Sequence, residues 1–246
     1  IDGWHLACGA FVSDGPAGLN TRHHLKIETT SFPSPIALSA SWDLGLVRSV
    51  AKGIGDEARS VGVDVVLGPC VNVIRSPIAG RTFECFSEDP LLSSQVAVAF
   101  VGGLQSDSGV AACVKHFVCN NQETARKSVN VRVSERALRE IYLPSFEACV
   151  LRARVASLMT SYNRVNGQFA CESELLTRVL RGDWKFDGVV MSDWGGGHDV
   201  ASSVISGLDV KMPGPPGDRD SDSIRICKKQ QQLRDSVIYS RERQRS

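Results

Sequence analysis

The 246-residue chain lacks any apolar run near the roughly 20 residues that a membrane-spanning helix needs, so the sequence predicts no contact with a bilayer core. It also lacks an excess of charge of either sign, with 28 basic residues against 27 acidic ones. That balance gives no reason to expect nucleic acid or an anionic membrane as a partner. Residues 1–11 lack the basic and continuous apolar stretches of a signal peptide. The chain has no initiator Met, which fits a start partway through a longer protein.

Paired cysteine spacing is also missing, although the chain has eight cysteines. Zinc sites and small disulfide scaffolds need closely spaced pairs, and no C-x-x-C occurs here. Cys113 and Cys149 lie inside apolar segments, where a free thiol behaves as a small hydrophobic side chain. We therefore expect buried, reduced thiols, which favours a reducing compartment such as the cytoplasm. The adjacent His23 and His24 are expected to be exposed loop residues, so no metal site is predicted.

Short apolar runs, most of them rich in Val, recur along the chain and end in polar residues or in Gly and Pro. They occupy residues 61–69, 109–117, 155–163, 188–196 and 207–215. These runs do not alternate strictly between apolar and polar residues, which is typical of strands buried on both faces of a parallel sheet.

Helical periodicity separates these runs, most clearly over residues 47–58 and 134–149, and Ser134 is a plausible N-cap of the second helix. Alternating strands and helices predict an α/β fold, specifically a (β/α)8 TIM-barrel-like domain that need not be complete at either end. Residues 218–246 are rich in Arg, Gln and Ser and poor in core-forming residues. This tail is predicted to be disordered or solvated, and a basic interaction tail is the alternative.

Polar residues follow the predicted strands where βα loops of a barrel converge on one mouth. Read in strand order, they are Asn72 and Arg75, Lys115 and His116, Tyr162 and Asn163, and Asp193 and Trp194. The set combines a carboxylate, cations, amides and two aromatic faces, but no glycine-rich phosphate loop and no cluster of acidic metal ligands. Such a mixture suits a sugar, because charged and amide groups bind hydroxyls while an aromatic face covers the ring. A Schiff-base aldolase that uses Lys115 is the rival hypothesis.

Several segments resemble the N-terminal barrel of family 3 glycoside hydrolases, most closely the β-glucosidase branch. They are SDGPAGL (13–19), GPCVNVIRSPIAGRTFECFSEDP (68–90), VKHFVCNNQE (114–123), RVSERALREIYLPSFEACV (132–150), LMTSYNRVNG (158–167), LLTRVLRGDWKFDGVVMSDWGG (175–196) and GLDVKMPGP (207–215). The resemblance implies a barrel domain over residues 1–217. It also implies a retaining hydrolase that releases terminal β-linked glucose by double displacement, with no cofactor or metal.

The resemblance also implies roles for individual residues. Asp193 would be the nucleophile, since a retaining glycosidase needs a carboxylate to attack the anomeric carbon. Trp194 would form a wall for the sugar ring, Tyr162 would lie beside the nucleophile, and Met159 would line the pocket. The glycines after Trp194 would let the backbone pass close to the sugar.

The remaining implied residues bind the sugar hydroxyls. Asp14 resembles the family's acceptor of the distal hydroxyls, while Arg81, Lys115 and His116 resemble its donors to the same ring. Neighbouring polar residues are expected to be structural instead. Asn72 and Arg75 would brace the loop that carries Arg81, Glu123 and Arg126 would pair, and Glu84, Glu88 and Asp89 would form salt bridges or cap turns.

The general acid/base of this branch is a glutamate on a later domain, and nothing after Gly217 resembles that domain. The place where the N-acetylglucosaminidase branch carries its acid/base motif reads KHFVCNNQE, without that branch's Pro, Gly and second His. Two hypotheses follow. The chain belongs to a retaining β-glucosidase, or it is a catalytically incomplete sugar-binding barrel that lacks the acid/base domain.

Overall fold

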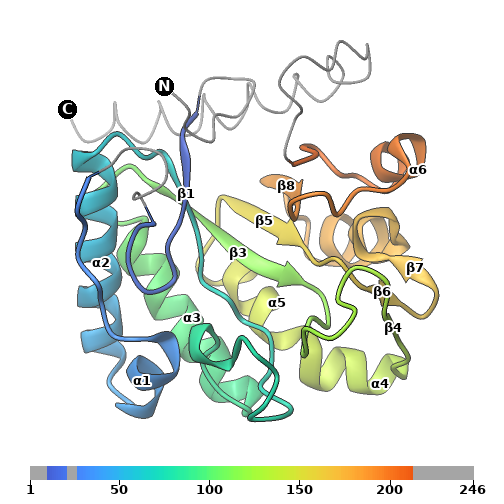
Figure 1. Ribbon diagram of the computed structural model, residues 1–246, viewed down its shortest axis with the longest axis horizontal. Helices are drawn as coiled ribbons and strands as arrows, with labels where there is room; N and C mark the ends of the chain where they lie inside the picture. The colour runs from blue at the N-terminus through green and yellow to red at the C-terminus, as the bar shows by residue number, and fades with distance from the viewer. Residues whose placement is uncertain (1–9, 21–26, 213–246) are drawn as a thin grey trace.

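The computed structural model describes residues 10–20 and 27–212 of the chain (Figure 1). The predictions for the histidine pair at 23 and 24 and for the tail at 218–246 lie outside these residues.

A five-stranded parallel sheet forms the centre of the fold, in the order β1-β2-β3-β5-β8. Its strands are β1 (Val12–Asp14), β2 (Val65–Leu67), β3 (Ala111–Phe117), β5 (Ser157–Thr160) and β8 (Val189–Ser192). Each strand pairs with its predecessor in the sheet, and a bridge between Met191 and Val210 extends the sheet by one more segment. This progressive parallel order is that of a TIM-barrel-like α/β fold. Within residues 10–20 and 27–212 the strands form an arc, not a closed ring of eight.

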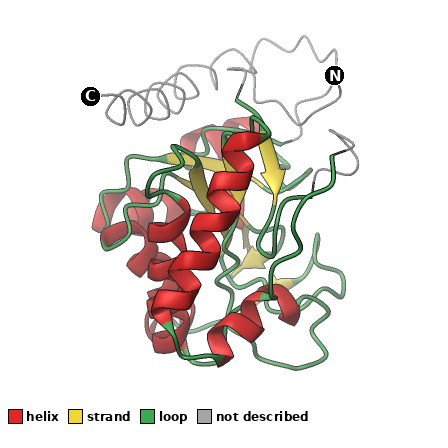
Figure 2. Ribbon diagram, turned by 90° about the vertical axis from the view of Figure 1, so that its left-hand side faces the viewer, coloured by secondary structure: helices red, strands yellow, loops and turns green. Residues whose placement is uncertain are grey.

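Helices connect the strands and cover the outer face of the sheet (Figures 1 and 2). They are α1 (Pro35–Ala40), α2 (Leu44–Ser60), α3 (Pro90–Leu104), α4 (Glu135–Ala137), α5 (Pro144–Leu151) and α6 (Val200–Ile205). Short turns of 3-10 helix occupy Thr82–Glu84 and Ala170–Glu172, and π-helical segments occupy Leu138–Tyr142 and Leu176–Asp183. A small sheet of β4 (Asn130–Val131), β6 (Arg164–Val165) and β7 (Gln168–Phe169) lies beside the main one. No helix in the described part of the chain is long and apolar enough to span a membrane.

The main sheet is buried on both faces, which explains why its strands do not alternate between apolar and polar residues. One apolar cluster, which includes Val66, Val114 and Val190, joins the strands to the helices. A second cluster fills the concave side of the sheet. It contains the strand residues that alternate with those of the first cluster, including Val65 and Met191. Successive side chains of a strand point to opposite faces, so a strand buried on both sides must be apolar at every position.

The sequence predicted four of the five strands and the extra segment after β8, whereas β1 and α3 were not predicted. Ser134 caps its helix as expected, because its hydroxyl accepts a hydrogen bond from the Ala137 amide at 3.2 Å. The predicted helix over 134–149 is interrupted, however. Leu143 N donates to Leu138 O, which is a wider π-type turn, directly before Pro144 starts α5. Proline has no amide hydrogen to continue the α-helical ladder, so the chain restarts there.

Helices α2 and α3 approach each other closely at two glycines. A Cβ placed on Gly103 would lie 2.2 Å from the carbonyl oxygen of Arg48, and one on Gly55 would lie 2.7 Å from that of Leu104. Only glycine fits where two helix backbones come this near. The contact holds the first two βα units together, and these units contain β1 and β2.

Candidate active site

A cavity of about 410 Å³ opens beyond the carboxyl ends of the strands. Its lining consists of Asp14, Asn20, Leu67, Arg81, Lys115, His116, Arg126, Met159, Tyr162, Asp193 and Trp194. All eight residues that the sequence predicted for a sugar site are in this set. The sequence did not predict Asn20 and Leu67 for the site, and it assigned Arg126 a structural role only.

The alternation of side chains along each strand explains how the charged residues reach the cavity. Val12 and Met191 belong to the concave cluster, and Asp14 and Asp193 follow each of them by two residues. Cys113 has the same relation to Lys115. Residues two apart on a strand share a face. These three charged side chains therefore lie on the same face as the concave apolar cluster, at the carboxyl ends of their strands.

Asp193 is buried, with 10% of its side chain exposed. Its Oδ1 accepts a hydrogen bond from the Trp194 amide at 2.7 Å, and its Oδ2 lies 3.7 Å from His116 Nε2. Tyr162 also hydrogen-bonds Asp193, and burial, together with this negative neighbour, raises the pKa of the tyrosine. Tyr162 is therefore a protonated donor at neutral pH, and Asp193 is held by groups from two neighbouring strand ends.

Lys115 and Asp14 form an ion pair with an Nζ–Oδ1 distance of 2.5 Å. The second carboxylate near Lys115 is Glu84, at 4.0 Å. Burial alone would lower the pKa of Lys115, but the charges of Asp14 and Glu84 raise it, so the side chain stays cationic. Burial opposes the charge of Asp14, yet Lys115 lowers the pKa of Asp14 overall. The Asp14 side chain still exposes 52% of its surface, at the cavity, where a ligand could reach it.

His116 is a neutral imidazole in a fixed tautomer. Burial, followed by the charges of Arg81 and Lys115, holds the pKa of His116 well below its usual value. Arg81 Nη2 is 3.1 Å from Nε2, and a guanidinium only donates, so Nε2 is the acceptor. The proton is therefore on Nδ1, which donates to Asn72 Oδ1 at 3.2 Å. Both ring nitrogens of His116 are thus engaged within the protein, Nε2 by Arg81 and Nδ1 by Asn72.

The roles expected for Asn72 and Arg75 were wrong. Asn72 clamps His116, since its side chain accepts from the His116 amide at 3.0 Å and donates to the His116 carbonyl at 2.9 Å. Arg75 donates to the hydroxyl of Tyr142, away from the loop that carries Arg81. Spacing along the chain placed both residues near the site, but their partners depend on how the loops fold back.

Glu123 joins the two arginines of the site. It pairs with Arg126 at 2.9 Å, as predicted, and lies 3.8 Å from Arg81. The guanidinium of Arg126 lies over the Tyr162 ring, 4.7 Å from its centroid, which is a cation–π arrangement. Arg126 thus lines the cavity as well as pairing with Glu123. Glu84 is paired with Arg81 as expected, and Asp89 caps α3 by accepting from Leu91 N at 2.8 Å.

The glycines after Trp194 shape the turn that follows β8. Gly195 has a φ of +74°, a conformation that favours glycine, and its amide donates to Met212 O at 2.6 Å. A Cβ on Gly197 would meet the Lys211 side chain at 3.3 Å. Gly196 packs against a cavity residue, because its amide donates to Asp193 O at 2.8 Å and a Cβ on it would lie 3.1 Å from that oxygen.

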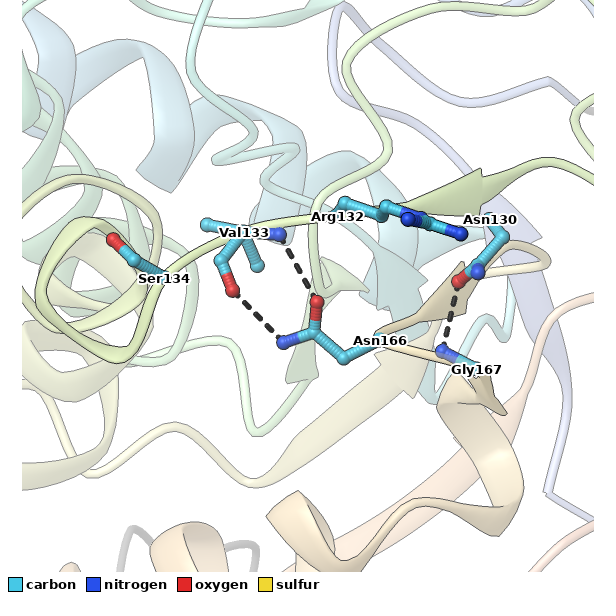
Figure 3. A pocket seen from close by; sticks show the side chains of 6 residues that line it. All are labelled: Asn130, Arg132, Val133, Ser134, Asn166 and Gly167. Carbon is cyan, nitrogen blue, oxygen red and sulfur yellow. Dashed lines mark hydrogen bonds between the residues drawn. The ribbon is translucent and has the colours of Figure 1, made fainter.

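A second hollow, of about 540 Å³, lies at the small sheet (Figure 3). Two asparagine side chains that line it form hydrogen bonds with backbone groups. Asn166 accepts from Val133 N at 3.0 Å and donates to Val133 O at 2.9 Å, and Asn130 accepts from Gly167 N at 2.8 Å. The hollow contains no acidic side chain. In the described residues no group of three or more His, Cys, Asp or Glu side chains could hold a metal ion, either there or at the main cavity.

The fold and the cavity together define an α/β-barrel domain with a buried carboxylate and several cations at the carboxyl ends of its strands. Comparison with known proteins identifies it further. Residues 13–213 match the model of the glycosyl hydrolase family 3 N-terminal domain. The chain belongs to glycosyl hydrolase family 3.

Individual relatives agree with this family and carry more than one name. A β-glucosidase of Rhizobium radiobacter is 49% identical over 211 residues, which are 85% of this chain and 26% of the relative. An exo-alpha-(1->6)-L-arabinopyranosidase of Bifidobacterium longum is 43% identical over 229 residues, 86% of this chain and 30% of the relative. The structure of a Kluyveromyces marxianus β-glucosidase in complex with glucose superposes with a TM-score of 0.90 at 36% identity, covering 98% of this chain and 32% of that one. The chain spans about a third or less of the length of these proteins.

Proposed function

We propose that this chain supplies the nucleophile and the glycosyl-binding cavity of a retaining β-glucosidase-type hydrolase. The observation that carries the proposal is the convergence of eight predicted residues, from five separate segments of the chain, on one cavity around Asp193. The fold brings the carboxyl ends of the strands to one mouth, but it does not require a carboxylate, cations and an aromatic ring to stand there together.

In this mechanism Asp193 attacks the anomeric carbon and forms a glycosyl ester, which water then hydrolyses. The fixed position of Asp193 supports this role. One oxygen is held by the Trp194 amide, and the donor Tyr162 orients the carboxylate without neutralising it. A nucleophile that is already oriented needs no reorganisation before attack.

The charged set opposite Asp193 would bind the hydroxyls of one terminal sugar unit. Asp14 and Lys115 present an acceptor and a donor side by side, and Arg81 adds further donors. Charge-assisted hydrogen bonds contribute about 1.5–3 kcal/mol each. The Trp194 ring, which also lines the cavity, would cover the apolar face of the sugar.

The aldolase hypothesis finds no support in the site. A Schiff-base lysine must lose its proton to act as a nucleophile, which requires a lowered pKa. Lys115 has the opposite environment, because Asp14 and Glu84 raise its pKa.

The general acid of the proposed reaction is expected to come from outside the described cavity. Among the residues that line it, Asp14 and Asp193 are the carboxylates. Asp14 forms an ion pair with Lys115, which lowers the pKa of Asp14. A carboxyl group with a lowered pKa is a poor proton donor. This favours a second candidate function for the chain by itself, namely a sugar-binding barrel that reaches the glycosyl-enzyme stage but does not turn over natural substrates efficiently.

The proposal is tested with a 2-deoxy-2-fluoro-β-glucoside that carries an activated aryl leaving group, followed by mass analysis of the intact chain. Such a leaving group needs little acid assistance, so the reagent tests Asp193 alone. We expect one fluoroglycosyl unit per chain. Cleavage after Lys185 and Lys211 yields a peptide with four aspartates, so fragmentation must place the label on Asp193.

The control variant is Asp187→Ala, an exposed aspartate in the same peptide that does not line the cavity. Labelling should survive in this variant and disappear in Asp193→Ala. A label on another carboxylate, retained in Asp193→Ala, would overturn the assignment.

A further inference from the structure

Two cysteines lie in contact directly behind the sugar cavity. The sulfur atoms of Cys70 and Cys85 are 3.4 Å apart, and both residues are buried free cysteines. Their backbones are bridge partners in a parallel pairing. No other pair of cysteines in the described part of the chain has its sulfur atoms in contact. This arrangement differs from isolated core thiols such as Cys149.

The backbone is already placed for a covalent link between them. Adjacent parallel strands lie about 4.8 Å apart, and Cα atoms joined by a disulfide are usually 4.4–6.8 Å apart. Bond formation needs the sulfurs to move from 3.4 Å to about 2.05 Å, which is roughly 0.7 Å for each. Side-chain rotation supplies a movement of this size.

One of the two cysteines lines a small hollow. Cys85 lines a hollow of about 20 Å³ together with Arg81, Thr82, Asn120 and Glu123, whereas Cys70 does not line it. Such a volume holds about one water-sized molecule. Hydrogen peroxide is close to that size, whereas a glutathione disulfide is far larger.

We propose that Cys70 and Cys85 are a peroxide-reactive dithiol that forms a reversible disulfide beneath the sugar cavity. The Cys85 sulfur attacks one peroxide oxygen, the O–O bond breaks, and water leaves to give a sulfenic acid. The Cys70 sulfur then attacks the Cys85 sulfur, the S–O bond breaks, and a second water leaves. One peroxide is thus reduced to two waters while two thiols become one disulfide.

The link would join two segments that hold sugar-binding residues. Cys85 Sγ contacts the carbonyl oxygen of Arg81 at 3.6 Å, and Cys70 Sγ lies 3.7 Å from His116 Nδ1. The disulfide would therefore tie the loop of Arg81 to the segment after β2, beside His116. The hydrogen bond with Cys70, together with burial, raises the pKa of Cys85, so the Cys85 side chain rests as a thiol and its reaction with peroxide is slow.

The test treats the folded full chain with hydrogen peroxide, blocks free thiols, and maps peptides without reduction. Trypsin leaves Cys85 and Cys113 in one peptide, so a second cleavage after acidic residues must separate them. We expect a species two hydrogens lighter, with the peptide of Cys70 linked to that of Cys85, and full reversal by dithiothreitol. A link to another cysteine, or none after the other thiols have been oxidised, would overturn the proposal.

Two variants and one physical measurement sharpen the result. Cys70→Ser should stop the reaction at a Cys85 sulfenic acid that dimedone traps, while Cys149→Ala should leave the link intact. Because the link closes a 15-residue separation, the oxidised chain should unfold several degrees higher than the reduced chain. A linked chain with an unchanged or lower Tm would show that the disulfide does not stabilise the loop. These readouts need no glycosidase activity, so they are independent of the proposed function.

Discussion

Lys115 and Asp14 are 101 residues apart in the chain and meet at 2.5 Å at the edge of the cavity. Lys115 lies at the inner layer of β3, with 3% of its side chain exposed, and Asp14 ends β1. The pair joins two strands that are not neighbours in the sheet, since β2 lies between them. The pair therefore connects the edge strand β1 to the central strand β3. Tests of the site begin with this pair.

Asp14→Ala is expected to weaken the binding of glucose to the folded chain about tenfold or more. The variant removes a charge-assisted acceptor, worth about 1.5–3 kcal/mol, and frees Lys115 from its closest partner. Isothermal titration of glucose measures the effect, and Asp187→Ala serves as the exposed control. Equal affinity in a folded Asp14→Ala chain would remove Asp14 from the binding set.

Acid should destabilise the chain partly through Asp14. Its pKa is lowered below 3.8 in the folded state, so near and below that pH the unfolded chain binds more protons. The stability from this group is present above about pH 4 and is lost as the pH falls through the folded pKa. Thermal unfolding between about pH 5 and pH 3 should therefore show a shallower decline for Asp14→Asn than for the unsubstituted chain. Parallel curves would contradict the pairing.

His116 is expected to remain neutral, with its proton on Nδ1, well below pH 6.5. Burial and the nearby cations oppose a second proton, and Asn72 accepts the one that is present. Nitrogen-15 NMR of the imidazole at about pH 5.5 reports both the charge and the tautomer. Asn72→Ala should perturb the tautomer and lower stability by about 1–3 kcal/mol, because it leaves buried groups of His116 unpaired. A charged imidazole at that pH would refute this description.

Turnover should depend strongly on the leaving group. Loss of general acid assistance typically costs about 10²–10⁴-fold, mostly for poor leaving groups. The chain alone should be nearly inert toward cellobiose but active on aryl β-glucosides, and azide should accelerate the second reaction by attacking the glycosyl ester. Initial rates on both substrates measure this. Robust cellobiose hydrolysis would mean that a carboxylate of this chain acts as the acid, with Glu84 and Glu88 the first to test.

The contact between α2 and α3 predicts opposite effects for two adjacent glycines. Gly103→Ala places a methyl group against the Arg48 carbonyl, which cannot move without shifting a helix, and should cost about 1–3 kcal/mol of stability. Gly102→Ala meets only the end of the exposed Arg48 side chain, at 3.1 Å, and should be neutral or stabilising. Chemical denaturation of the two variants provides the comparison. Equal stabilities would mean that the helices are less closely packed.

The sequence predicted the parts of this protein that have a local hydrophobic pattern, either a short apolar run or helical periodicity. Residues 61–69, 155–163 and 188–196 contain β2, β5 and β8, and the helix predicted over residues 47–58 lies within α2. It did not predict β1, because a strand of three residues that contains Ser and Asp has no apolar pattern to detect. The family resemblance placed Asp14 at the site without any prediction of its strand.

The rest of the site depends on loops, whose paths leave no periodic trace in sequence. Arg126 lies in the segment between β3 and β4, yet it reaches back over Tyr162 to line the cavity. The bracing role expected of Asn72 failed for the same reason, since its partner is 44 residues away. Contacts of this kind are set by tertiary folding, and only a structure reveals them.

The apolar residues of both parities in β8 have a consequence for insertions and deletions. Val189, Val190 and Met191 are all buried, so a slip of the strand by one residue would exchange one apolar side chain for another and keep the interior filled. The same slip would turn Asp193 from the cavity toward the helices, where a carboxylate would be buried without its partners. Apolar packing alone would therefore allow this strand to shift its register by one residue. Only one register places Asp193 at the cavity.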